Sequence, residues 1–189
     1  MSAIAWLQKL MYSFHMKNVC ALALLGVFAS TVFCTTVVAG SPDIFLSVLA
    51  EVKGKTKVPV LLPTELPRPF RDAKHTSVDK ATADEYSVSL YYELDAGDAG
   101  FAAGFVGKNN SPYSPQELGN VDKVRLTRGI VGYFRPVSCG GSCAPANLWW
   151  EQGGTLYQIQ LELPSTLGEK KQQKVITAVA NSAILAGPR

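Results

Sequence analysis

Alternation of apolar and polar residues is the clearest structural signal in this chain. Such an alternating stretch runs from Glu85 to Leu94, and one of its faces collects Tyr86, Val88, Leu90, Tyr92 and Leu94. A period of two residues is typical of a β-strand with one buried face. Turn-forming residues occupy Asp95–Gly100, and a second apolar stretch follows at 101–106. The pattern therefore predicts a hairpin of two antiparallel strands.

Two more hairpins are predicted further along the chain. Val121–Leu126 and Gly129–Arg135 form one pair of strand-like segments. Leu148–Gln152 and Thr155–Leu163 form the other, with two glycines in the turn between them. In the last segment the inward positions are expected to be Tyr157, Ile159, Leu161 and Leu163, opposed by Gln158, Gln160 and Glu162.

Prolines and polar residues predict irregular structure before the first of these strands. Val58–Pro63 is apolar but is interrupted by a proline, which cannot donate a hydrogen bond to a sheet, so we expect an edge or extended segment. Pro63–Phe70 contains further prolines and predicts an extended surface loop. The polar run Arg71–Ser77 is typical of a solvated loop.

Helical periodicity is found on both sides of the strands. Pro42–Val52 carries apolar residues at helical spacing and is followed by a basic, glycine-containing stop. Near the C-terminus, Thr166 and Glu169 have the spacing of a capping box, ahead of a helix with Val175, Ile176, Val179 and Ala180 on one face. The sequence therefore predicts the α+β class, with a single antiparallel sheet of about six to seven strands packed by an N-terminal and a C-terminal helix.

An uncharged apolar segment, Val19–Ala39, follows a basic residue and is typical of an export signal. It ends in the small residues that signal peptidase requires, so we predict a signal peptide, residues 1–39, and a single secreted globular domain, residues 40–189. A compact basic start favours Met16 as the true first residue. The alternative is a membrane anchor that is not cleaved, because Val19–Val38 is long enough to span a bilayer.

Composition and charge narrow the function classes. The chain is 47% hydrophobic and 17% charged, which excludes a disordered or low-complexity protein. Removal of residues 1–39 takes away Lys9 and Lys17 and lowers the formal net charge from +3 to +1. A nearly neutral protein has no long-range attraction for nucleic acid, so we expect no nucleic-acid partner, and membrane contact only through a retained signal segment. The expected localisation is secreted or periplasmic.

Two cysteines, Cys139 and Cys143, remain after the predicted cleavage and are expected to form a disulfide with each other. The glycines between them give the flexible turn that a short bridge requires. A redox-active role is the alternative, although thioredoxin-like catalysis uses a two-residue spacer and here the spacer has three residues. A zinc site would need both thiols together with His75, and we expect neither a metal nor a cofactor.

His75 is the only histidine after the predicted cleavage site. Hydrolysis at neutral pH most often needs a histidine general base, oriented by an acid and facing a nucleophile. A small secreted hydrolase that uses His75 with serine or carboxylate partners is therefore the alternative from the enzyme class. Because His75 lies in a polar run, we instead predict an exposed side chain without a catalytic partner.

Aromatic residues offer the candidate binding surface. Trp149 and Trp150 are adjacent in a predicted strand, so they must point to opposite sides of the sheet. If the helices cover one sheet face only, the other face exposes an aromatic strip suited to a ligand, a glycan or a protein partner, drawn from Tyr91, Tyr133, Trp149 or Trp150, and Leu156. The alternative is that a helix or the Pro63–Phe70 loop covers these residues.

Two stretches of sequence carry a family resemblance. Trp150–Gly154, Tyr157–Ile159 and Val179–Ser182 resemble the closing strand, hairpin and helix of uncharacterised extracytoplasmic bacterial domains. Val58–Pro67 looks like the extended proline-rich start of the same kind of domain. The resemblance implies a secreted α+β domain and transfers no catalytic residue. The function we expect is therefore a non-catalytic exported domain that binds a small ligand, a glycan or an envelope protein.

Overall fold

The computed structural model describes residues 43–111, 114 and 118–189. The predicted signal peptide at 1–39, the preferred start at Met16 and the alternative anchor at Val19–Val38 lie outside the described residues. Within the described ranges, no helix is both long enough and apolar enough to cross a membrane.

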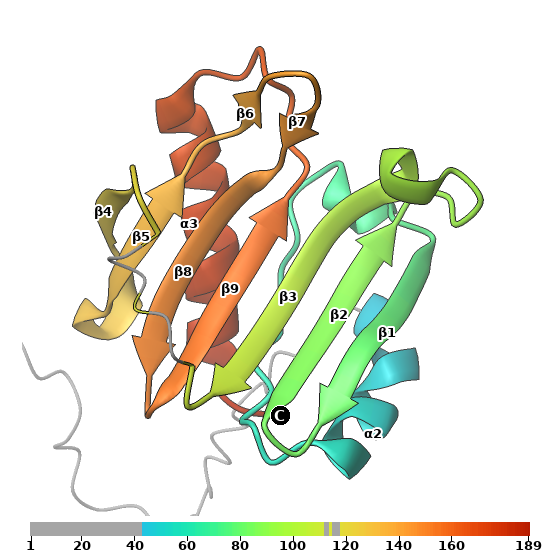
Figure 1. Ribbon diagram of the computed structural model, residues 1–189. Coiled ribbons are helices and arrows are strands. Elements are labelled where there is room, and N and C mark those ends of the chain that lie inside the picture. The colour runs from blue at the N-terminus through green and yellow to red at the C-terminus, as the bar shows by residue number, and fades with distance from the viewer. Residues whose placement is uncertain (1–42, 112–113, 115–117) are drawn as a thin grey trace, which may run out of the picture. The chain divides into compact units, whose positions relative to one another are not determined.

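The protein has the predicted α+β fold, with a seven-stranded sheet in which all neighbouring strands are antiparallel (Figure 1). The strand order is β1-β2-β3-β9-β8-β5-β4. A separate two-stranded hairpin is formed by β6 (Ser138–Cys139) and β7 (Cys143–Ala144). The strands of the large sheet are β1 (His75–Thr82), β2 (Glu85–Tyr91), β3 (Phe101–Asn109), β4 (Asp122–Arg125), β5 (Val131–Arg135), β8 (Ala146–Gln152) and β9 (Thr155–Leu161).

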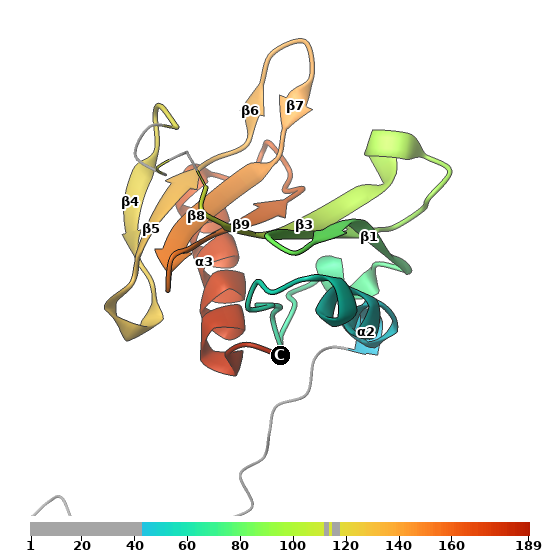
Figure 2. The ribbon, with the colours of Figure 1, turned by 60° about the horizontal axis from the view of Figure 1, so that its bottom comes forward.

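Both α-helices of the described residues lie on the same side of this sheet, which we call the inner face (Figure 2). The helix α2 (Leu46–Lys55) follows a short 3-10 turn, η1 (Asp43–Phe45), and α3 (Glu169–Ala186) closes the chain. Further 3-10 turns lie in the connections that the structure describes, at η2 (Phe70–Asp72), η3 (Gly97–Gly100) and η5 (Thr127–Gly129). The opposite side of the sheet, which we call the outer face, has no described helix on it.

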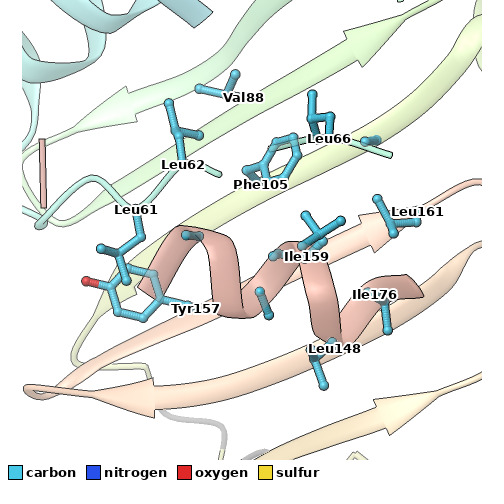
Figure 3. Packing of buried hydrophobic residues seen from close by; sticks show 14 of the residues in the cluster. Leu61, Leu62, Leu66, Val88, Phe105, Leu148, Tyr157, Ile159, Leu161 and Ile176 are labelled. Atoms are coloured by element: carbon cyan, nitrogen blue, oxygen red, sulfur yellow. The ribbon is translucent and has the colours of Figure 1, made fainter. Parts of the chain in front are cut away.

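The core fills the space between the inner face and the two helices. On the sheet side, Val88, Phe105 and Ile159 lie directly opposite one another in register on neighbouring strands and are almost completely buried. Ile176 of α3 packs beside Leu148 and Ile159 (Figure 3). The alternating positions predicted to be inward in the last strand are all buried, because α3 packs on that side.

The proline-containing segment, Val58–Phe70, contributes side chains to the core, so the predicted surface loop at Pro63–Phe70 is right only for exposed residues such as Glu65 and Arg68. Leu62 and Phe70 are fully buried and Leu66 is 2% exposed. The segment is extended but pairs with no strand, as its prolines require. Its side chains enter the core under the inner face, where Leu61, Leu62 and Leu66 lie near Val88 and Tyr157 (Figure 3).

Tyrosine hydroxyls bind the backbone of this segment in place of a neighbouring strand. The Tyr86 hydroxyl accepts a hydrogen bond from the Leu61 N–H (3.0 Å) and donates one to the Leu61 carbonyl (3.1 Å). Tyr157 donates to the Pro59 carbonyl at 3.0 Å. Burial raises the pKa of Tyr86 far above its ordinary value, so its hydroxyl stays neutral and makes both bonds. Buried backbone groups need such partners.

The polar run before Glu85 forms a strand, so the predicted solvated loop at Arg71–Ser77 is wrong in its second half. β1 begins at His75 and pairs with β2 along its length, with an irregularity between Val78 and Lys80. As the edge strand of the sheet it buries little, and therefore it does not need the apolar alternation on which the prediction relied.

The predicted capping box at Thr166 is also absent. α3 begins at Glu169, Gly168 is its N-cap residue, and no side chain caps it. Gln172, which is 2% exposed, instead anchors this end of the helix. It donates to the Leu167 carbonyl (2.5 Å) and accepts from the Val137 N–H (2.8 Å). The helix start is therefore set by a buried tertiary contact and not by a local cap.

Candidate functional site

A row of side chains crosses the outer face at right angles to the strands. We call it the outer row. Strand register places its members directly opposite one another on β2, β3, β9, β8 and β5. They are Ser89, Gly104, Gln160, Asn147 and Arg135. Four of these five residues carry no charge, which gives the middle of the face a neutral, hydrogen-bonding character.

An aromatic pair lies at one end of the outer row. Tyr91 of β2 and Phe101 of β3 are half-buried, and their ring centroids lie 6.0 Å apart in an edge-to-face arrangement. The Phe101 ring reaches over Gly104, because a Cβ atom at that position would lie 3.4 Å from Phe101 Cζ and 3.3 Å from Gln160 Oε1. The absence of a side chain at Gly104 thus brings an aromatic ring beside the amide of Gln160.

Amide side chains occupy the middle of the outer face. Gln158 and Gln160 project from β9, and both are half-buried. The Gln158 Nε2 donates to Asn147 Oδ1 at 2.7 Å, and the Asn147 Nδ2 donates to the Pro145 carbonyl at 2.8 Å. The Gln160 amide lies free of any such bond among the described residues. This part of the face can therefore both donate hydrogen bonds to a ligand and accept them from it.

An arginine and a tryptophan close the other end of the row. The Arg135 guanidinium carbon lies 5.1 Å from the centroid of the Trp149 ring, and the guanidinium also donates to the Leu118 carbonyl. Tyr133 lies directly opposite Trp149 in register. Although both aromatic residues are on the outer face, Trp149 is 6% exposed and Tyr133 is 8% exposed. Trp149 and Tyr133 therefore pack against their neighbours at this end of the face and expose little surface to a ligand.

Charged side chains on the outer face toward β1 pair with one another. Glu85 lies 2.7 Å from the Lys80 ammonium and 3.9 Å from that of Lys108. The Asp79 carboxylate accepts hydrogen bonds from Ser89 (2.5 Å) and Ser87 (3.2 Å). Since these groups neutralise each other locally, the outer face has no strong charge of one sign beside the amide row.

The five residues of the predicted aromatic strip do not form one surface. Tyr91 of β2 and Leu156 of β9 are half-buried on the outer face, opposite the two ends of β3, which separates their strands. Tyr133 and Trp149 are adjacent there but buried. Trp150 is on the inner face, 1% exposed, and its ring stacks on that of Tyr157 with centroids 5.4 Å apart. The alternative prediction, in which other parts of the protein cover these aromatic residues, is therefore correct for Trp150.

Sequence reasoning missed Phe101, Asn147 and Arg135 as members of the surface. The signal that could have found them is the alternation itself, since each lies one position from an apolar residue that the structure buries on the inner face. Gln158 and Gln160 were predicted to point outward, and they do. What the alternation could not supply is the order of strands that joins these positions into one row.

The β6–β7 hairpin rises from the end of the sheet on the outer side (Figure 2). Cys139 and Cys143 lie directly opposite each other in it and form the predicted disulfide, with an S–S distance of 2.07 Å. Both residues are exposed, and the Gly140 N–H donates to the Ser142 carbonyl at 2.9 Å within the turn. The bond therefore stabilises the shape of an exposed hairpin beside the outer face.

His75 is exposed at the first position of β1, as predicted. It borders a shallow hollow of about 230 Å³ that also contains Glu93 and Asp95. Glu93 pairs with Lys74 at 3.4 Å, and no hydrogen bond to His75 is found among the described side chains. The described residues also contain no group of three or more histidine, cysteine or acidic side chains arranged to hold a metal ion.

A second hollow, of about 410 Å³, lies near the hairpin and is lined mainly by apolar residues. Tyr92 reaches it with a buried hydroxyl that has no hydrogen-bond partner among the described atoms. Burial, with the charges of Asp72 and Glu162, raises the pKa of Tyr92, and burial also raises the pKa of Glu162.

Comparison with known proteins adds no assignment. No family model, curated protein or solved structure matches this chain. The resemblance to extracytoplasmic bacterial domains therefore stays a prediction, and the geometry of the outer face carries the functional argument.

Proposed function

We propose that the protein is an exported, non-catalytic domain that binds a ligand at the cell envelope on the outer face of its sheet. Among the ligand classes considered, a glycan chain fits this face best. The observation that carries the proposal is the Tyr91–Phe101 pair at one end of the outer row, beside the Gln160 amide, on a face that no described helix covers.

The chemistry of this face matches that of a sugar chain. Aromatic rings offer an apolar surface to the C–H faces of sugar rings, and amide groups donate to and accept from hydroxyl groups. Half-exposed Tyr91, Phe101, Gln158 and Gln160 provide both kinds of contact side by side. Because Glu85 pairs with Lys80 and Lys108 on the side of this face toward β1, the face around the amides favours an uncharged ligand over a polyanion.

The two other function classes have less support. A hydrolase would need a nucleophile and an orienting acid at His75, which is exposed and has no hydrogen-bond partner among the described side chains. A redox protein would need a reactive thiolate, usually at a helix N-terminus, whereas Cys139 and Cys143 are bonded to each other in a hairpin. An envelope protein as the ligand remains the alternative outcome of the binding test below.

Export is tested by sequencing the N-terminus of the protein recovered from outside the cytoplasm. We expect the mature chain to begin at Gly40, because the small residues before it satisfy signal peptidase. An exposed disulfide in the hairpin is compatible with an oxidising compartment. Recovery of a chain that still begins at Met1 or Met16 would contradict cleavage and would favour the anchor at Val19–Val38.

Glycan binding is tested by screening the mature protein on a panel of neutral and charged oligosaccharides. For the best ligand, we expect Tyr91→Ala, Phe101→Ala and the double variant Gln158→Ala/Gln160→Ala each to weaken binding by about tenfold or more. These side chains are half-exposed, so the variants should stay folded. Leu185→Ala, at an exposed position of α3 on the other side of the sheet, is the control and should bind like the wild type.

Two results would count against this function. Folded outer-face variants that retain full affinity would show that the ligand binds elsewhere. A wild-type protein that binds no oligosaccharide but captures an envelope protein through the same residues would reject the glycan and keep the outer face as the binding surface.

A further inference from the structure

A basic groove of about 540 Å³ lies between the edge strand β4 and the helix α3. Lys123 and Arg125 contribute from β4, and Lys170 and Lys174 contribute from α3, with Val124 also in the lining. No acidic residue lines it. The groove is distinct from the outer row, which ends at Arg135 of β5 and leaves β4 free.

The four cationic side chains of the groove have no partners of opposite charge. None of them takes part in an ion pair within the described ranges of the chain. Asp122 and Glu169 precede Lys123 and Lys170 in sequence, but both line the neighbouring hollow and not this groove. Unpaired like charges gathered in a concave site raise the local concentration of anionic ligands.

A polar group in the groove wall also lacks a partner. The Thr177 hydroxyl, on the same helix as Lys170 and Lys174, is buried and makes no hydrogen bond with any described atom. Buried polar atoms nearly always have a hydrogen-bond partner. The groove thus offers an occupant four cationic side chains that have no acidic partner among the described residues, and its wall contains one buried hydroxyl without a described partner.

The free edge of β4 supplies a further set of binding groups. The Leu126 N–H donates to the Ile130 carbonyl at 2.8 Å, which marks a hydrogen-bonded pair at the end of the β4–β5 ladder. Antiparallel pairing alternates, so Val124 also bonds toward β5, and the backbone N–H and C=O groups of Lys123 and Arg125 point away from the sheet. An extended peptide can bind those groups.

The cations lie where the side chains of an added strand would point. Successive side chains of a strand project to opposite faces of a sheet. Lys123 and Arg125 are on the outer face with Tyr133 and Val131, whereas Lys170 and Lys174 belong to the helix on the inner face. A strand added to β4 would therefore meet positive charge on both of its faces.

We propose that the β4–α3 groove binds an extended acidic segment of a partner protein, which adds to the sheet as a strand beside β4. A competing explanation is that lysine and arginine on an edge strand prevent aggregation and bind nothing. That explanation accounts for Lys123 and Arg125, but it does not account for Lys170 and Lys174, which line the same groove from the helix. An acidic strand accounts for all four cations.

The test uses the mature protein and a library of synthetic peptides in which acidic and β-branched residues are combined. We expect the best peptides to bind with an affinity that falls as salt concentration rises, because exposed charges are screened. Lys170→Glu/Lys174→Glu should weaken binding by at least about tenfold. The matched control is Lys53→Glu/Lys57→Glu, which makes the same charge change at exposed positions away from the groove and should leave binding unchanged.

Amide hydrogen exchange separates strand addition from simple charge attraction. With a bound peptide, we expect the amides of Lys123 and Arg125 to exchange more slowly, because they become hydrogen-bonded to the added strand. Polyphosphate and anionic lipid vesicles serve as probes without a peptide backbone. Equal binding of all these anions without protection of the two amides would overturn the proposal in favour of a general anion site. Binding of no peptide in the library, or equal loss in the control variant, would also overturn it.

Discussion

Replacement of Trp150 by alanine is expected to lower the free energy of unfolding by about 3–5 kcal/mol. Trp150 is 1% exposed on the inner face, and its ring stacks on Tyr157 with centroids 5.4 Å apart. The Trp150 indole N–H has no hydrogen-bond partner among the described atoms, so the loss comes from packing and the cavity left behind. Gly132, its neighbour in register on β5, has no side chain with which to fill that cavity.

Trp149→Ala is the matched comparison, because the same side chain is removed one position earlier in the same strand. Trp149 is on the outer face under the Arg135 guanidinium, where solvent and that arginine can occupy the vacated space. We therefore expect Trp149→Ala to cost at least about 1 kcal/mol less than Trp150→Ala. Denaturant unfolding of both variants measures the difference. An equal or larger loss at Trp149 would contradict this assignment of the two sheet faces.

The hairpins of this fold could be predicted because their signals are local. β2–β3, β4–β5 and β8–β9 each combine a suitable strand pattern with turn-forming residues between the strands, and all three pairings are confirmed by the register. The pairing of β3 with β9 could not be predicted in this way, because Phe105 and Ile159 are neighbours only in the folded chain. The outer row depends on that pairing, and so no sequence pattern contained it.

The errors occurred where tertiary contacts outweigh local patterns. The segment around Leu61 was predicted to be an edge or extended segment, and it is extended; its burial could not be predicted, because hydroxyl groups of Tyr86 and Tyr157 satisfy its backbone from the sheet. β1 looked like a loop because an edge strand can be polar on both faces. The start of α3 depends on buried Gln172, which bonds to the distant Val137.

The candidate sites were predictable to different degrees. Opposite orientations for Trp149 and Trp150 follow from strand geometry and are confirmed. The sequence also indicates which of the two tryptophans is inward. A two-residue turn places Trp150 opposite Tyr157, and Tyr157 was already expected to be inward. The β4–α3 groove could not be predicted, because it requires the last strand in sheet order to lie beside the C-terminal helix.

Gly107→Ala is expected to lower the free energy of unfolding by about 3 kcal/mol, at the upper end of the usual cost of overpacking a core. A Cβ atom at this position would lie 2.3 Å from Tyr86 Cε1 and 3.0 Å from Val58 Cγ1. The Tyr86 ring cannot move aside easily, because it is fully buried and its hydroxyl is bonded to both backbone groups of Leu61. The introduced methyl group therefore strains the contact between the sheet and the proline-containing segment.

Two further variants show whether that clash is the cause. Gly54→Ala makes the same change in α2, where nothing lies within 4 Å of the new atom, and it should stabilise the protein by about 0.4–1 kcal/mol. In a Tyr86→Leu background the ring atoms are gone, so Gly107→Ala should cost less than half of what it costs in the wild type, although Tyr86→Leu is itself destabilising. Chemical denaturation of the four combinations at 86 and 107 measures this coupling. Additive losses would mean that Tyr86 does not resist the methyl group and that the strain at Gly107 arises elsewhere.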